Sequence, residues 1–287
     1  MIFAGRHYIY LRQLKEFRIW NLSDLHLLSK NCAESELDRD IAEIRDDPHA
    51  FWQGGGDYAE YISPRDKRFR AENCDERILP HLGNLGRFTT EYVRDKLAPI
   101  KHKCLGLLFG NHEDKYQQTM EQDDLHSWLC TELEVPNLGY CAMYDISFVF
   151  DKRADPPFLS HDVRHSRGKT TTLWTRRVFT HHGRGAAQTP GGKLNYLIRA
   201  FNAFNADIYF LGHVHDQVGR RQPSIGANSD CTKATSTDKL GVVSGSYLKT
   251  YEQDTIGYGE VAMYSPTVLG ASIVTVDPHR KEMRGSV

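Results

Sequence analysis

Short apolar runs alternate with amphipathic segments over the first three quarters of the chain. Runs rich in aromatic and branched residues end in glycine or polar residues, which predicts strands at 17–22, 50–53, 104–109, 176–180 and 207–211. Apolar residues at helical spacing predict helices at 34–44, 124–133 and 193–204. Strands that alternate with helices are typical of an α/β fold with parallel pairing.

The pattern changes after residue 215. The polar stretch 219–239 predicts a surface loop, and the stretches 62–80 and 151–175 predict long loops or insertions. Three further runs predict strands without intervening helices, which favours antiparallel pairing: 240–249, 259–265 and 271–277. The 287 residues show neither an internal repeat nor a linker, so we expect a single domain spanning 1–287.

Composition narrows the classes of function. The chain is 25% charged with a formal net charge of −1, so no global field attracts it to nucleic acid or to an anionic membrane. None of its six cysteines forms a CxxC pair, which is typical of a reducing compartment. Arg6 and His7 interrupt the apolar start, and no run is long enough to span a bilayer. We therefore expect a cytoplasmic protein without a membrane partner, and the sequence leaves its oligomeric state open.

Each of the five predicted strands in the first three quarters is followed by residues that can bind a metal. They are Asp24 and His26, then Asp57, then Asn111 and His112, then His181 and His182, and finally His213 and His215. Ligands of α/β sheets bind beyond the carboxyl ends of the strands, where loops bring distant residues together. We expect these side chains to meet in one site.

Each residue alone has a simpler explanation. Asp24 could cap a turn, Asn111 could occupy a left-handed turn position, and a single histidine is more often structural than catalytic. Together these explanations would require five separate coincidences, all at strand ends. Carboxylate and imidazole ligands without cysteine suit Mn, Fe, Zn, Co or Ni. A bridging carboxylate can hold two such ions roughly 3.5–4 Å apart, the arrangement used in phosphoryl chemistry.

In this order the residues resemble the motifs of the calcineurin-like metallophosphoesterase superfamily. The matching stretches are Asp24-Leu25-His26, Gly56-Asp57, Gly110-Asn111-His112-Glu113, His182 and Gly212-His213-Val214-His215. The glycine-rich stretch 183–195, which leads into the predicted helix at 193–204, resembles a subset found in bacteria and their phages. That stretch either meets a phosphate through its backbone N–H groups or is a simple turn.

The resemblance implies a four-layer αββα sandwich with two mixed sheets and a dinuclear metal site at the strand ends. It assigns the first metal to Asp24, His26 and His215, the second to Asn111, His182 and His213, and the bridge to Asp57. A hydroxide between the metals would attack phosphorus, and His112 would stabilise the transition state or protonate the leaving oxygen. The expected cofactors are two divalent metal ions, with Mn²⁺ favoured and Fe, Zn, Co, Ni or Mg as alternatives.

Three questions stay open at this point. His181 and His182 are adjacent, and the glycine that follows favours His182 as the ligand. A basic run either recognises further phosphates or is a solvated loop; its members are Lys152, Arg153, Arg164, Arg167, Lys169, Arg176, Arg177 and Arg184. The expected function is hydrolysis of a phosphate ester, with a diester favoured and a phosphorylated small molecule or nucleic acid as substrate. The alternative is a catalytically silent scaffold on the same fold, which the retention of His112 disfavours.

Overall fold

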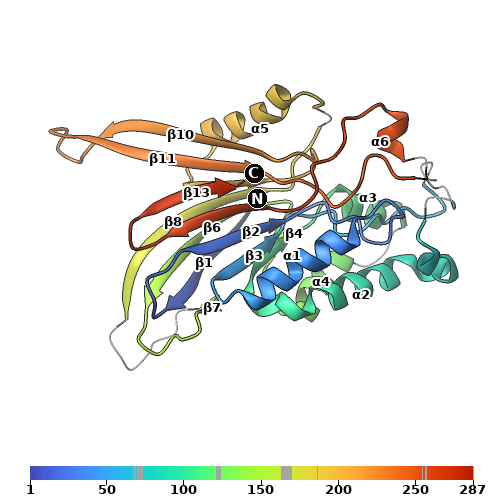
Figure 1. Cartoon of the computed structure of the whole chain (residues 1–287), viewed down its shortest axis with the longest axis horizontal. Coiled ribbons are helices and arrows are strands. Elements are labelled where there is room, and N and C mark those ends of the chain that lie inside the picture. Colours follow the sequence, from blue (N-terminus) through green and yellow to red (C-terminus); the bar gives the residue numbers. More distant parts are fainter. Residues whose placement is uncertain are drawn as a thin grey trace.

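The computed structural model describes residues 1–66, 69, 71, 74–120, 124–162, 170–185, 187–253, 255 and 257–286. Within these residues the strands form two sheets, each with both parallel and antiparallel pairs (Figure 1). The predicted α/β class and the two mixed sheets are therefore confirmed.

The first sheet has seven strands in the order β10-β11-β9-β8-β6-β1-β7. Its strands are β1 (Ile2–Leu11), β6 (Cys141–Phe150), β7 (Phe158–Ser160), β8 (Thr171–His181), β9 (Ile208–Leu211), β10 (Val218–Ala227) and β11 (Ala234–Val243). The strands β8 and β9 run parallel to each other, so their carboxyl ends reach the same edge.

The second sheet has six strands in the order β13-β12-β2-β3-β4-β5. Its strands are β2 (Phe17–Leu22), β3 (Ala50–Gly54), β4 (Cys104–Leu108), β5 (Asn137–Gly139), β12 (Ser272–Asp277) and β13 (Glu282–Ser286). The strands β2, β3 and β4 are parallel neighbours, so the loops that follow them also lie at one edge.

Six α-helices and two 3₁₀ helices occur in the described part of the chain. They are α1 (Glu34–Asp46), η2 (Glu76–Asn84), α2 (Leu85–Leu97), η3 (Ala98–Lys103), α3 (Asn111–Met120), α4 (Leu125–Leu133), α5 (Pro190–Ala203) and α6 (Tyr258–Val261). The three predicted helices correspond to α1, α4 and α5, each within three residues of the predicted bounds. Lys103 caps the carboxyl end of α1, because its ammonium donates hydrogen bonds to the carbonyls of Ile44, Arg45 and Asp47.

The apolar core has three main parts. One cluster joins α1, α2 and α4 to the second sheet through buried residues such as Leu37, Trp52 and Leu129. A second contains residues of both sheets, including Ile19 of β2 and Phe148 of β6. A third packs α5 against the first sheet, and Figure 1 shows α5 on the opposite side of the molecule from α1, α2 and α4.

The last quarter of the chain departs from the sequence predictions. The predicted surface loop 219–239 is most of a two-stranded ribbon, β10 and β11, that extends from the body (Figure 1). Its residues are polar because both faces of most of the ribbon are exposed, so the apolar alternation that normally identifies a strand is absent. The predicted strand 259–265 is also wrong, since it begins within the short helix α6.

The described residues of the two predicted long loops include regular elements. The stretch 62–80 includes the start of η2, and 151–175 includes β7 and the first residues of β8. The strand predicted at 176–180 thus begins at residue 171. The basic residues Arg164, Arg167 and Lys169 lie outside the described residues. Within the described part, all six cysteines are free thiols, and a helix long and apolar enough to cross a bilayer is not found.

Candidate metal centre

The predicted site residues follow five strands that end at a common edge of the molecule. Asp24 and His26 follow β2, Asp57 follows β3, and Asn111 and His112 follow β4 in the second sheet. His182 follows β8, while His213 and His215 follow β9 in the first sheet. Both sheets therefore contribute to one cluster of side chains.

The backbone at this edge is bent sharply. Asp24, His26, Asp57, His213 and His215 all have positive φ, between 46° and 71°. Residues other than glycine adopt this left-handed region at a cost of roughly 1–3 kcal/mol each, and they cluster at functional sites. The bends aim each side chain inward rather than along its strand.

Two glycines make room for the carboxylates. A Cβ on Gly110 would lie 2.0 Å from Oδ1 of Asp57, and a Cβ on Gly212 would lie 2.9 Å from Oδ2 of Asp24. A side chain at Gly110 would collide directly with the carboxylate of Asp57, and one at Gly212 would collide first with Oγ of Ser23 and then with Asp24. This close approach explains why glycine precedes Asn111 and His213 in the sequence.

Asp24, His26 and His215 form one group whose nitrogen and oxygen atoms lie within 4.8 Å of one another. The Nε2 atoms of His26 and His215 face each other at 3.4 Å, and Nε2 of His215 lies 3.2 Å from Oδ1 of Asp24. Asp24 is fully buried, and its other oxygen accepts a hydrogen bond from the backbone N–H of His213. These are three of the residues expected at the first metal.

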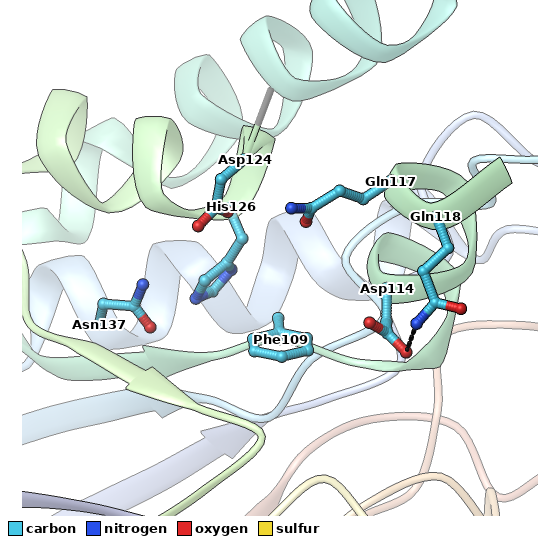
Figure 2. A pocket seen from close by; sticks show the side chains of 7 residues that line it. All are labelled: Phe109, Asp114, Gln117, Gln118, Asp124, His126 and Asn137. Atoms are coloured by element: carbon cyan, nitrogen blue, oxygen red, sulfur yellow. Dashed lines mark hydrogen bonds between the residues drawn. The ribbon is translucent and has the colours of Figure 1, made fainter. Parts of the chain in front are cut away.

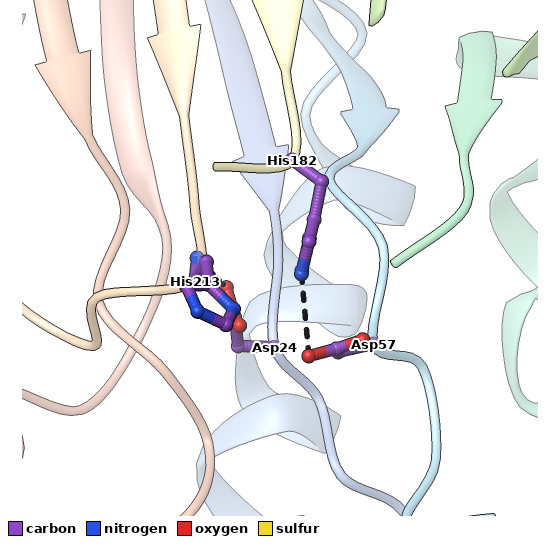
Figure 3. A group of neighbouring side chains, drawn as sticks. All are labelled: Asp24, Asp57, His182 and His213. Atoms are coloured by element: carbon purple, nitrogen blue, oxygen red, sulfur yellow. Dashed lines mark hydrogen bonds and ion pairs between the residues drawn. The ribbon is translucent and has the colours of Figure 1, made fainter. Parts of the chain in front are cut away.

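Asp57, His182 and His213 form a second group that shares Asp24 with the first. Figure 3 shows the imidazole of His182 pointing at Asp57, with a Nε2–Oδ2 distance of 3.3 Å. The same Nε2 atom lies 3.1 Å from Oδ1 of Asn111. The carboxylate that the two groups share is Asp24, whereas the resemblance assigns the bridge to Asp57, so the bridging role of Asp57 stays a prediction.

The histidines are held by their second ring nitrogens. Nδ1 of His26 donates to Oε2 of Glu60 (3.0 Å), Nδ1 of His182 donates to the carbonyl of Gly55 (2.8 Å), and Nε2 of His213 donates to the carbonyl of Gly185 (3.1 Å). A neutral imidazole that donates from one nitrogen presents a lone pair on the other. Metal-binding histidines are held in this way, because the partner fixes both the tautomer and the ring orientation.

Two buried atoms of the cluster lack a hydrogen bond. Oδ1 of Asp24 and Nδ1 of His213 have no hydrogen-bond partner among the described residues. The close approach of His215 to Oδ1 is not aligned as a hydrogen bond. Buried polar atoms are normally paired because an unpaired one costs about 1–3 kcal/mol. A carboxylate oxygen and an imidazole lone pair left in this way fit a cation, so these residues are suited to holding a metal ion.

The electrostatics of the cluster also favour cations. Burial raises the pKa of Asp24, but the contact with His215 and the neighbouring imidazole charges outweigh it and bring the pKa to about 2. Burial lowers the pKa of His182, but the negative charge of Asp57 outweighs it and raises the pKa to about 10. Protons on histidine thus balance the buried carboxylates in the metal-free chain. Divalent cations would replace those protons, since metal ligands must be deprotonated.

His112 lies beside the first group. Its ring contacts the ring of His26 edge-on at a centroid distance of 4.9 Å, and its backbone N–H donates to Oδ1 of Asp57. Nδ1 of His112 donates to the backbone carbonyl of Glu60 at 2.6 Å. This hydrogen bond leaves Nε2 as the ring atom that would carry a transferable proton.

The sequence prediction gave no role to two carboxylates, Glu60 and the motif residue Glu113. Glu60 holds His26 through its side chain and His112 through its backbone, and the three residues form a third group of possible ligands. Glu113 is buried and accepts from the backbone N–H groups of Asp57, Tyr58 and Gly110. Burial raises the pKa of Glu113 to about 7. Their positions, three residues after Asp57 and directly after His112, are the only signals of these roles that the sequence contains.

The structure brings all eight predicted site residues together, although their roles as ligands and acid stay predictions. His181 points elsewhere, and its Nδ1 accepts from the backbone N–H of Gly183. Several described members of the basic run are paired: Arg153 with Asp151, Arg176 with Asp207, and Arg177 with Asp145. These ion pairs favour a structural role for the three arginines over recognition of further phosphates.

A cavity of about 620 Å³ opens over the cluster. It is lined by His26, Asp57, Asn111, His112, His213 and His215. Further residues of the lining include Leu28, Asn31, Glu60, Ile62, Ile78, Gln188, Lys193, Leu248 and Tyr264. A second cavity is lined by Phe109, His126 and five polar residues of α3, β5 and the start of α4 (Figure 2). None of the eight predicted site residues lines this second cavity, so we assign the chemistry to the first.

Comparison with known proteins does not identify a family for this chain. No family model matches the chain, and no curated protein matches it. One solved structure that it resembles is a conserved uncharacterised protein of Streptococcus pneumoniae, described as a predicted phosphoesterase. The two chains are 11% identical, the match covers 92% of this chain and 86% of the other, and the TM-score is 0.31. At that score the likeness carries no weight, so the case rests on the residues of this chain.

Proposed function

We propose that the protein is a dinuclear metal-dependent phosphoesterase with a preference for phosphodiesters, built as one four-layer αββα domain. The observation that supports this most is the pair of buried ligand atoms without a hydrogen bond, Oδ1 of Asp24 and Nδ1 of His213, within a cluster of carboxylates and oriented imidazoles. Asp24, His26 and His215 would hold one ion, Asn111, His182 and His213 the other, and Asp57 both. Two divalent ions, Mn²⁺ by preference, would supply Lewis-acid activation of water and of the phosphoryl oxygens.

The chain itself would orient the substrate and move a proton. The carbonyl of Glu60 fixes the ring of His112 through Nδ1. His112 would therefore donate the proton on Nε2 to the oxygen of the leaving group. Glu113 ties the loop after β3 to the loop after β4, which keeps Asp57 and His112 in register. The cavity walls would exclude bulk water from the reacting phosphate.

Hydrolysis of bis-p-nitrophenyl phosphate by the Mn²⁺-loaded protein tests this proposal. We expect turnover of this compound and of a dinucleoside phosphate. In His112→Ala, hydrolysis of the dinucleoside phosphate should fall at least 100-fold, because its alkoxide leaving oxygen needs the proton and general acid catalysis typically contributes 10²–10⁴-fold. Release of p-nitrophenolate, which leaves as an anion, should fall less. Asp57→Asn should also lose metal, measured by elemental analysis of the dialysed protein. Arg153→Gln, which alters an exposed ion pair outside the cluster, is the matched control and should keep full activity.

Two results would contradict the proposal. A protein that binds no divalent metal would rule out the metal centre. A protein that holds two equivalents of metal but turns over no mono- or diester would instead support the scaffold alternative.

A further inference from the structure

We infer that the cavity over the cluster selects esters with a single phosphate whose remaining part is uncharged and partly apolar. This inference rests on the proposed function, because it takes the cluster as the site where the phosphate binds. It concerns the residues that line the cavity beside the predicted metal ligands, and these residues are called the walls below.

The size of the cavity fits a small molecule. Its volume of about 620 Å³ falls within the range of roughly 300–1,000 Å³ that is typical of small-molecule sites. Apolar side chains such as Leu28, Ile62 and Ile78 line the walls. Leu248 and Tyr264 come from the segment between β11 and β12 and also line the cavity. These groups would contact a ring or chain rather than a second charged group.

The hydrogen-bonding groups of the walls are mostly neutral. Asn31, Gln188, Thr250, Ser265 and Thr267 line the cavity and contribute amide and hydroxyl groups. Such groups bind uncharged hydroxyl, carbonyl or ring nitrogen atoms. These neutral groups can form hydrogen bonds with a substrate, but they do not supply the positive charge that binding a second phosphate would require.

The two lysines of the described lining are already paired. Nζ of Lys193 lies 3.2 Å from Oδ2 of Asp216, and Nζ of Lys249 lies 2.5 Å from Oε2 of Glu252. A cation that is neutralised in this way offers little net attraction to a second anion. The described walls therefore lack the excess positive charge that normally recognises a polyanion such as nucleic acid.

A matched pair of substrates tests the inference. Thymidine 5′-(p-nitrophenyl phosphate) has an uncharged nucleoside, and its 3′-phosphorylated derivative has the same scissile diester with one further phosphate. We expect kcat/KM for release of p-nitrophenolate to be at least tenfold lower for the derivative, mainly through KM. For the first substrate, kcat/KM should change less than twofold between 50 and 500 mM salt, because few counterions are released.

Removing the acidic partner of a lysine in the cavity wall should reduce the preference for the substrate that lacks the 3′-phosphate. Glu252→Gln removes the partner of Lys249, and Glu252 is not among the residues of the metal cluster. We expect KM for the 3′-phosphorylated substrate to fall severalfold, while hydrolysis of bis-p-nitrophenyl phosphate stays unchanged. Asp238→Asn, which removes an equivalent partner from Arg221 on the ribbon, is the control and should change neither value.

The outcomes separate the two proposals. Loss of all turnover on bis-p-nitrophenyl phosphate would defeat the proposed function and the inference with it. Normal turnover of that compound, combined with an equal or better kcat/KM for the 3′-phosphorylated substrate, would overturn only the inference. Strong, salt-sensitive inhibition by single-stranded DNA would likewise replace it with a nucleic-acid substrate.

Discussion

Glu60 connects two functional histidines through different parts of the same residue. Its carboxylate accepts from His26, a predicted metal ligand, and its backbone carbonyl accepts from His112, the predicted acid. A change of the side chain should therefore affect the metal ligand and leave the acid in place. This separation makes Glu60 a positioning residue whose role can be measured.

We expect Glu60→Ala to weaken Mn²⁺ binding by about 10–100-fold, since the partner of a ligating histidine typically contributes that much. Glu60→Gln keeps an oxygen that can accept from Nδ1 of His26, so its affinity should stay within a few fold of the wild type. Calorimetric titration of the metal-free protein measures both values. Equal affinity of Glu60→Ala and the wild type would show that the hydrogen bond does not orient His26.

The residues with positive φ show why the site could be predicted from the sequence. Asp, Asn and His tolerate positive φ better than other residues, and Asp24, His26, Asp57, His213 and His215 all have it. The same residue types supply metal ligands, so the sequence signal for a turn and the signal for a ligand coincide. The sequence could not identify Glu60 or Glu113, because their roles depend on contacts between loops that follow different strands.

At the scale of elements, the sequence predicted the strands and helices whose apolar residues are regularly spaced and pack into the core. The strands β2, β3, β4 and β9 and the helices α1, α4 and α5 lie close to the predicted ranges. The long strands β1 and β6 were not predicted, because polar residues such as Arg6 and Asp145 interrupt their apolar pattern and pair across the exposed face. The ribbon β10–β11 was not predicted because most of it lacks a buried face.

Helix α4 contains a titratable group that should make stability depend on pH. His126 is buried, and its ring lies near that of Phe109 (Figure 2). Its Nε2 donates to the carbonyl of Leu107, while its Nδ1 has no hydrogen-bond partner among the described residues. Burial lowers its pKa from 6.5 to about 4. The unfolded chain therefore binds a proton more readily below pH 6.5, so His126 removes stability as the pH falls from 6.5 towards 4.

Between pH 7 and pH 5 this histidine should cost about 2 kcal/mol of the free energy of unfolding. His126→Gln cannot titrate and can still donate to Leu107, so the variant should lose about 2 kcal/mol less than the wild type over that interval. Urea unfolding of the metal-free proteins at both pH values measures the difference. Parallel pH profiles for the two proteins would show that His126 titrates normally.

At the scale of the whole molecule, the candidate centre joins the two sheets. The second sheet supplies Asp24, His26, Asp57 and Asn111, and the first supplies His182, His213 and His215. Backbone hydrogen bonds also connect the loop after β2 to its neighbours: the N–H of Asp24 donates to Gly56 in the loop after β3, and the N–H of Tyr247, in the loop after β11, donates to the carbonyl of Asp24. Ions bound there would add contacts between the sheets that the unfolded chain does not have.

Removal of metal should therefore lower the thermal stability of the whole chain. Binding at a free-ion concentration of 100 times the dissociation constant contributes about 2.7 kcal/mol, which for a chain of this size corresponds to a shift in Tm of roughly 5 °C. We expect chelation followed by dialysis to lower Tm by about that amount, and Mn²⁺ to restore it in a concentration-dependent manner. In His182→Ala the Tm should respond weakly to Mn²⁺, because one ligand at the boundary between the sheets is lost. A wild-type Tm that is independent of both chelator and Mn²⁺ would mean that the cluster holds the sheets together through protonated histidines and carboxylates alone.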